Sequence, residues 1–291
     1  MKERSFPKEP ASGTIGHNAK DAGSQSPSKY WSRKIAMLAI NKALVTGGNL
    51  DSIRDPWEGE ESESSSIRCG SYDTGMTALP ALGADDFSRD PLLLADALRD
   101  HSACWIAEWP DAALRDALRG ELQRLQWSDG LSPAAVGRND SRALRNDIRN
   151  DTTCWLDDPR CGDPARVFLA RLNAIRTALN RSLFLGLAEC EAHYAAYPPG
   201  GGYARHRDRF RDSDSRVISW VTYLNADWST DDGGALRLHI DSDDVDGNAV
   251  DRSPFGGSIC FLSELEHEVL PARRERLSIA GWFRKAPHRF A

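Results

Sequence analysis

The chain has 291 residues, of which 40% are hydrophobic and 27% are charged, a composition typical of a folded protein with one sizeable core domain. Its net charge of −6 argues against a general nucleic-acid binder. No apolar run reaches the ~20 residues that a membrane span requires, and the 6 scattered cysteines form no CxxC pair, which favours free thiols in a reducing, cytoplasmic compartment.

Residues 1–85 differ in composition from the rest of the chain. They are rich in Ser, Gly, Lys and Glu, and such segments bury too little apolar surface to offset the entropy that ordering costs. Within them only residues 34–46 have helical character. We therefore predict a disordered leader over 1–85 and one folded domain over 86–291.

The folded domain is predicted to begin with helices. Leu and Ala recur at helical spacing in residues 90–101 and 110–125, and both segments open on an Asp–Pro or Pro–Asp start signal. The longest helical pattern covers residues 163–183. Its apolar positions are Val167, Leu169, Leu172, Ile175 and Leu179.

The remainder of the domain is predicted to be mostly strands. Short runs rich in Val, Ile, Tyr, Trp and Phe alternate there with Gly, Asp and Ser. The runs are 188–197, 217–224, 235–240, 258–262, 267–270 and 277–283. Helices first and strands afterwards predict an α+β protein with a mostly β core, an antiparallel double sheet supported by N-terminal helices.

The strongest chemical signal lies around His206 and Asp208. They are two residues apart, so on an extended chain both side chains point to the same side and reach one ion. His267, on a later predicted strand, adds a second imidazole, and the cation Arg276 follows it. Two His and a carboxylate serve non-haem iron(II) oxygenases and also catalytic zinc, and the later cation and the double-sheet pattern favour iron.

The other histidines have no such partners in the sequence. We interpret them as ordinary surface or core side chains. They are His17, His101, His193, His239 and His288.

From about residue 86 to residue 283 the chain resembles the 2-oxoglutarate oxygenases of the prolyl 4-hydroxylase superfamily, and within it the bacterial relatives of the hypoxia-inducible-factor prolyl hydroxylases. The motifs are Asp147-Ile148-Arg149-Asn150-Asp151 with Trp155, Tyr197-Pro198-Pro199-Gly200 with Tyr203 and His206, Tyr223-Leu224-Asn225-Ala226-Asp227-Trp228, Gly233-Gly234-Ala235-Leu236, and His267-Glu268-Val269 with Pro271, Arg276 and Trp282. The resemblance implies a double-stranded β-helix, or jelly roll, with flanking helices.

The resemblance also assigns the metal and cosubstrate residues. His206, Asp208 and His267 match the iron ligands. Arg276 matches the residue that pairs with the distal carboxylate of 2-oxoglutarate, a task that suits a guanidinium because it donates two parallel charge-assisted hydrogen bonds.

Three further positions match the cosubstrate pocket. Tyr223 matches a donor to the same carboxylate, Tyr197 a pocket tyrosine, and Leu236 an apolar wall residue. Ala280 stands where the family often has Thr, so one polar contact near the cosubstrate is absent.

The implied chemistry requires Fe(II), 2-oxoglutarate and O2, with ascorbate as reductant, and it releases succinate and CO2. Related halogenases replace the ligand carboxylate with a small residue, so Asp208 favours hydroxylation. The implied substrate is a prolyl residue in a polypeptide, with Arg149, Asp151 and Tyr203 as candidate substrate contacts. The alternative for Arg149 and Asp151 is an ion pair that only stabilises a hairpin.

Two other function classes stay open, an oxygenase of a small molecule or nucleic acid base and a non-catalytic jelly-roll binding module. Nucleic-acid demethylases of the superfamily usually carry a second arginine where Trp282 stands, and a binding module has no need of the complete ligand set. Arginines near the metal strands predict either a basic rim for an acidic peptide or solvated charges balanced by Asp212, Asp214 and residues 241–246. They are Arg205, Arg207, Arg209, Arg211, Arg273, Arg274 and Arg284.

Overall fold

The computed structural model describes residues 79–135, 145, 147–209, 215–240 and 249–286. The predicted leader lies outside the described residues except for 79–85. In that short stretch Leu82 is buried in the core, and strand β1 (Ala81–Leu82) pairs with strand β2 (Ala103–Ala107). The folded part of the chain therefore includes residues just before the predicted boundary at 86.

The described part of the chain contains four α-helices, all of which lie before strand β5 (Leu187–Tyr197) in the chain order. They are α2 (Ala84–Arg89), α3 (Leu92–His101), α4 (Ala112–Trp127) and α5 (Asp163–Leu183). The carboxylate of Asp111 caps α4 by accepting a hydrogen bond from the Leu114 amide at 3.0 Å. On α5 the core face is centred on Phe168 and Leu172, whereas Val167 is 44% exposed. That helix is where the sequence predicts it, with its buried face turned slightly from the predicted one.

Two β-sheets form the core. The larger has the order β1-β2-β10-β7-β12-β5-β4-β3, and the smaller has the order β6-β11-β8-β9. Besides β1 and β2, the larger sheet contains β3 (Ser132–Pro133), β4 (Thr152–Trp155), β5 (Leu187–Tyr197), β7 (Arg216–Tyr223), β10 (Gly257–Leu262) and β12 (Arg276–Lys285). The smaller sheet contains β6 (Tyr203–His206), β8 (Leu236–His239), β9 (Ala249–Arg252) and β11 (Glu266–Val269). A 3-10 turn, η3 (Thr230–Asp232), precedes β8.

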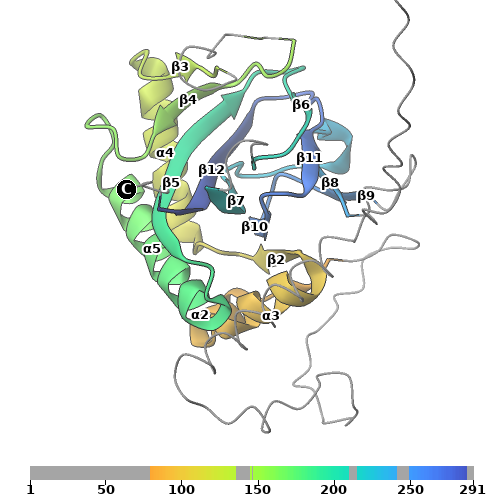
Figure 1. The fold of residues 1–291 in the computed structure, drawn as a ribbon. Helices are drawn as coiled ribbons and strands as arrows, with labels where there is room; N and C mark the ends of the chain where they lie inside the picture. The colour runs from red at the N-terminus through yellow and green to blue at the C-terminus, as the bar shows by residue number, and fades with distance from the viewer. Residues whose placement is uncertain (1–78, 136–144, 146, 210–214, 241–248, 287–291) are drawn as a thin grey trace, which may run out of the picture.

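Every described strand pair except β1–β2 is antiparallel. The helices lie against one side of the larger sheet, and the smaller sheet lies on its other side (Figure 1). The predicted α+β fold with a mostly β double sheet and supporting helices is confirmed. None of the helices in the described part of the chain is long and apolar enough to span a membrane.

The register of two strand pairs positions the candidate site. On β11, His267 lies opposite His206 of β6. On β12, Arg276 lies opposite Tyr197 of β5. Because side chains alternate along a strand, the even-numbered positions of β12 from Arg276 to Trp282 share one face, and this face lines the space between the two sheets.

Candidate metal centre

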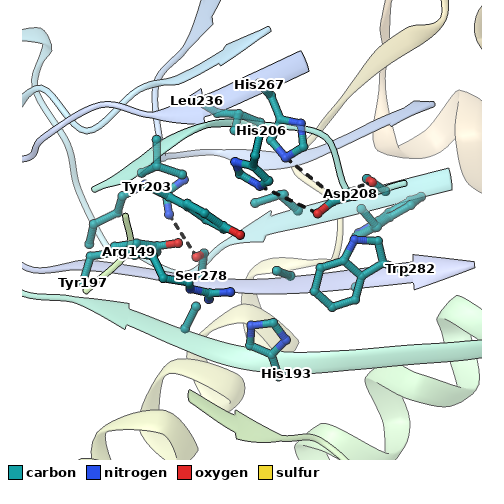
Figure 2. Close-up of a pocket in the computed structure, with 18 of the residues that line it drawn as sticks. Arg149, His193, Tyr197, Tyr203, His206, Asp208, Leu236, His267, Ser278 and Trp282 are labelled. Atoms are coloured by element: carbon teal, nitrogen blue, oxygen red, sulfur yellow. Dashed lines mark hydrogen bonds and ion pairs between the residues drawn. The ribbon is translucent and has the colours of Figure 1, made fainter. Parts of the chain in front are cut away.

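Two histidines and one aspartate converge between the sheets. The Nε2 atom of His206 lies 3.8 Å from Oδ1 of Asp208, and Nε2 of His267 lies 3.5 Å from Oδ2 of the same carboxylate (Figure 2). One potential ligand atom from each residue lies within 4.8 Å of the others. Asp208 and His267 are buried, and His206 is partly buried. The three side chains that the sequence analysis selected are therefore brought together.

Both imidazoles are oriented by main-chain carbonyls. Nδ1 of His206 lies 2.7 Å from the Ala204 oxygen, and Nδ1 of His267 lies 3.0 Å from the Leu265 oxygen. A carbonyl only accepts hydrogen bonds, so each Nδ1 carries the proton and each Nε2 keeps its lone pair. Those lone pairs belong to the atoms nearest Asp208, which is the arrangement of histidines that bind a metal.

The protonation states of Asp208 and His206 also suit a metal. Burial by itself raises the pKa of Asp208, but His267 and His206, with Arg216 and the Ser219 hydroxyl, outweigh it and bring the pKa to about 2. Burial, followed by the charge of His267, lowers the pKa of His206 to about 3. An ionised carboxylate beside a neutral imidazole is the state that a metal ligand must have.

A hydroxyl pair supports the carboxylate. Ser219 on β7 donates to Oδ2 of Asp208 at 2.7 Å, and its oxygen lies 2.9 Å from the hydroxyl of Ser263. This hydrogen bond holds Asp208 in place within a buried environment. Two imidazoles and a supported carboxylate fit a divalent first-row metal ion and leave other coordination positions to ligands from outside the protein.

Arg276 lies in the same cavity and lacks a charge partner. Its side chain is buried, with the residue only 1% exposed, and no carboxylate among the described residues pairs with it. Its Nε donates to the Gly234 carbonyl at 2.9 Å and its Nη1 to the Ser278 hydroxyl at 3.1 Å, while Nη2 has no partner. A buried cation with an unused donor is costly unless a ligand completes it, so the site fits an external carboxylate.

The sequence assigns three further residues to the cosubstrate. Two of them lie beside the Arg276 guanidinium, and the third lines the cavity. The rings of Tyr197 and Tyr223 lie 5.3 and 5.4 Å from its central carbon. The Tyr223 hydroxyl is buried without a hydrogen-bond partner, and burial raises its pKa to about 12, so it remains a neutral donor. Leu236 is buried and forms part of the cavity wall. Two unused donors beside one cavity strengthen the fit to a dicarboxylate.

The cavity also contains side chains that the sequence analysis did not select. They are His193, Arg216, Ser219 and Ser278. His193 was interpreted as an ordinary core or surface histidine. It is buried, but it forms part of the cavity wall, so that interpretation is incomplete. The signal that would have found it is alternation along β5, where His193, Ala195 and Tyr197 share a face.

The candidate substrate residues lie beside the metal ligands. The ring of Tyr203 stacks on His206 with centroids 3.6 Å apart, and the guanidinium of Arg149 lies 4.6 Å from the centre of the Tyr203 ring. Arg149 and Tyr203 line the cavity. Asp151 is absent from the lining, and its carboxylate accepts two hydrogen bonds from Arg149, the one from Nε measuring 2.7 Å. The burial of this pair favours the structural alternative for Asp151.

We expect Arg149→Ala to destabilise the fold. The side chain of Asp151 is 0% exposed and that of Arg149 is 13% exposed, so truncation leaves a buried carboxylate without its partner. Removing one member of a buried pair typically costs about 3–5 kcal/mol. Thermal melting measures the loss, and Arg145→Ala is the matched control because the neighbouring Arg145–Asp147 pair is 53% and 63% exposed. Equal melting temperatures for the two variants would contradict a stabilising role.

Five of the seven arginines predicted near the metal strands pair with acidic side chains in the described part of the chain. Arg205 and Arg207 pair with Glu266, and Arg209 pairs with Glu264. Arg274 and Arg284 also form ion pairs with acidic neighbours. The ion pairs of these described arginines therefore favour balanced surface charges over a basic rim. Glu266 on β11 and Glu264 in the turn before it are the acidic partners of the arginines around His206 and Asp208. Arg211 and the acidic residues of the sequence prediction, Asp212, Asp214 and 241–246, lie outside the described residues.

Comparisons with known proteins agree with the geometry. A family model described as the 2OG-Fe(II) oxygenase superfamily matches residues 192–284. The crystal structure of a Pseudomonas putida prolyl-4-hydroxylase is 40% identical in sequence, has a TM-score of 0.59, and matches over 67% of this chain and 99% of that chain.

Two further relatives are prolyl hydroxylases. One from Trichoplax adhaerens, solved in complex with a hypoxia inducible factor oxygen degradation domain peptide fragment, is 25% identical with a TM-score of 0.60 over 69% of this chain and 91% of that one. The hypoxia-inducible factor prolyl hydroxylase of Caenorhabditis elegans is 30% identical over 178 residues, which are 56% of this chain and 24% of that protein. The chain thus spans about a quarter of the length of the Caenorhabditis elegans relative.

Proposed function

The chain belongs to the 2OG-Fe(II) oxygenase superfamily, and from this premise we propose that it hydroxylates a prolyl residue in a polypeptide. One observation carries the oxygenase chemistry. The proposed metal ligands, which include a neutral imidazole and an ionised carboxylate, share a cavity with Arg276, a buried arginine that no described carboxylate pairs with. The prolyl substrate is supported by the similarity to prolyl hydroxylases, one of which was solved with a peptide.

In this proposal His206, Asp208 and His267 hold Fe(II) through two Nε2 atoms and a carboxylate oxygen. Bound iron supplies the chemistry in which 2-oxoglutarate, O2 and a C–H bond give succinate, CO2 and a C–OH group. Ser219 and the two main-chain carbonyls keep the ligands in position before the cosubstrates arrive.

Arg276 and Tyr223 bind the distal carboxylate of 2-oxoglutarate in this proposal. The guanidinium stays ionised and has Nη2 to donate, and the neutral Tyr223 hydroxyl adds a second donor. Leu236 and Tyr197 border the cosubstrate and exclude water from it. Among the described residues no carboxylate neutralises Arg276, and neither its Nη2 nor the Tyr223 hydroxyl has a hydrogen-bond partner, so the bound carboxylate would satisfy both donors.

In this proposal Tyr203 and Trp282 form the aromatic part of the wall that the prolyl ring meets. Both border the cavity near the metal ligands, and Arg149 holds Tyr203 from one side. An aromatic wall binds an apolar five-membered ring without needing a charge. We also propose ascorbate as the reductant that maintains Fe(II), and a cytoplasmic location, which the free thiols of the described cysteines support.

The proposed reaction is tested with a library of proline-centred peptides, Fe(II), 2-oxoglutarate and ascorbate. We expect one added oxygen atom on proline in selected peptides, located by tandem mass spectrometry, with matching release of succinate. Oxygen incorporated only into another residue, a free small molecule or a nucleic acid base would refute the prolyl assignment and favour the corresponding alternative.

A further inference from the structure

His193 is a buried polar side chain that has no hydrogen-bond partner among the described residues. The residue is 4% exposed, and neither Nδ1 nor Nε2 makes a hydrogen bond. It rises from β5 into the cavity, on the wall opposite His206 and His267 (Figure 2). Burying an imidazole without hydrogen bonds costs free energy, so a ligand that supplies the missing bond gains affinity.

Two tryptophans hold the imidazole in a defined orientation. Trp282 stacks on it with centroids 5.4 Å apart and planes 28° apart, and Trp155 meets it edge-on at 5.1 Å. Trp282 is itself covered by the guanidinium of Arg216, 3.5 Å from its ring centre. His193 is therefore placed in advance and loses little conformational entropy on binding a ligand.

A second unpartnered group lies beside it. Trp282 lines the same cavity, and its buried indole Nε1 makes no hydrogen bond among the described residues. Burial, with the positive charges of Arg149 and Arg216, lowers the pKa of His193 to about 3, so the ring is neutral and keeps one N–H donor. Two neutral donors without partners favour a ligand atom that accepts hydrogen bonds.

His193 lies some distance along the sheet from Arg276, the residue proposed to bind the distal carboxylate of 2-oxoglutarate. On β12, Arg276 lies opposite Tyr197, whereas Ala280 lies opposite His193. Four residues of strand separate these positions by about 13 Å. His193 and Trp282 therefore line a part of the wall that lies away from the backbone position of Arg276.

We propose that His193, together with the indole N–H of Trp282, binds a main-chain carbonyl of the polypeptide substrate next to the hydroxylated residue. This inference rests on the proposed function and adds a specificity contact to it. A carbonyl oxygen accepts two hydrogen bonds, so it has the capacity for both donors. Free proline carries no such peptide group and is expected to be a poor substrate.

The test uses His193→Phe and His193→Asn with the best peptide found for the unaltered enzyme. Phenylalanine keeps a ring between the tryptophans but removes both nitrogens, so we expect kcat/KM for the peptide to fall about 10- to 100-fold. The melting temperature should be unchanged or higher, because the unpaired polar atoms are gone. Asparagine keeps a donor and should recover part of the activity.

A second arm identifies the carbonyl. Each of the two carbonyls flanking the proline is reduced in turn to a methylene group. Reduction of the bound carbonyl should lower kcat/KM for the unaltered enzyme and have little further effect in His193→Phe, because both changes remove the same hydrogen bond. Calorimetry with Mn(II) in place of Fe(II) should give the same 2-oxoglutarate affinity in both proteins.

Three outcomes would overturn the inference, and they are distinguishable. Unaltered enzyme that modifies no proline peptide refutes the proposed function, and the inference with it. Equal peptide kinetics in the unaltered enzyme and His193→Phe refute the inference alone. A lower melting temperature with parallel losses of peptide and 2-oxoglutarate binding would assign His193 to packing or to the cosubstrate.

Discussion

Replacing His206 or Asp208 with alanine is expected to abolish 2-oxoglutarate turnover while the chain remains folded. Each side chain faces the other proposed ligands and supplies one of three ligand atoms that lie within 4.8 Å of one another. Changing only the partner of a metal ligand already costs about 10- to 100-fold, so loss of a ligand should lower succinate release by more than 100-fold. Succinate is measured with added Fe(II), and folding by circular dichroism.

The control for this experiment is His239→Ala. His239 lies on β8 in the same small sheet, but its imidazole pairs with Glu268 and lies outside the cavity lining. Its removal should leave turnover unchanged. A doubly altered enzyme, His206→Ala with Asp208→Ala, that still released succinate at the normal rate would show that the metal is held elsewhere.

Replacing Arg276 with alanine is expected to weaken 2-oxoglutarate binding roughly 10²- to 10³-fold. The guanidinium is buried, no described carboxylate neutralises it, and Nη2 has no hydrogen-bond partner. The distal carboxylate of the ligand would lose its charge partner in a desolvated site, which corresponds to about 3–4 kcal/mol. Calorimetry with Mn(II) measures the dissociation constant without turnover.

Two variants sharpen the Arg276 experiment. Arg276→Lys keeps the charge but loses the planar pair of donors, so it should retain part of the affinity. Arg274→Ala is the matched control, because Arg274 pairs with Asp227 and is 46% exposed. Unchanged affinity in Arg276→Ala, with a loss in Arg274→Ala, would transfer the carboxylate-binding role to Arg274.

Local sequence patterns predicted much of the secondary structure. The predicted helix at 163–183 coincides with α5, and the predicted strand at 188–197 begins one residue after β5 does. The apolar residues of each segment recur at the spacing of a helix or of a strand, so the secondary structure can be predicted from the local sequence. Strands β2 and β4 were not predicted. They are short and follow a helix or a polar segment, and pairing with neighbouring strands stabilises them, β2 with β1 and β10 and β4 with β3 and β5.

Residue types and their spacing along the chain were enough to identify the candidate ligand set and the cation that follows it. His206 and Asp208 are two residues apart, a spacing that on an extended chain predicts both side chains on one side. In the structure β6 ends at His206, and Asp208 lies in the bend that follows. Arg276 could be selected because it follows His267 in a motif. Such signals depend on residue type and local spacing, which the chain carries along its length.

The side chains that meet across strands became identifiable from the folded arrangement of the sheets. His193 enters the cavity because β5 pairs with β12 in one register, and a shift by one residue would turn its ring to the other face. Arg149 became the partner of a fully buried carboxylate, and Arg205 found Glu266 on a distant strand. Burial and cross-strand pairing arise from long-range packing. Alternation along β5 shows which side chains share a face with His193, but it does not show what that face meets.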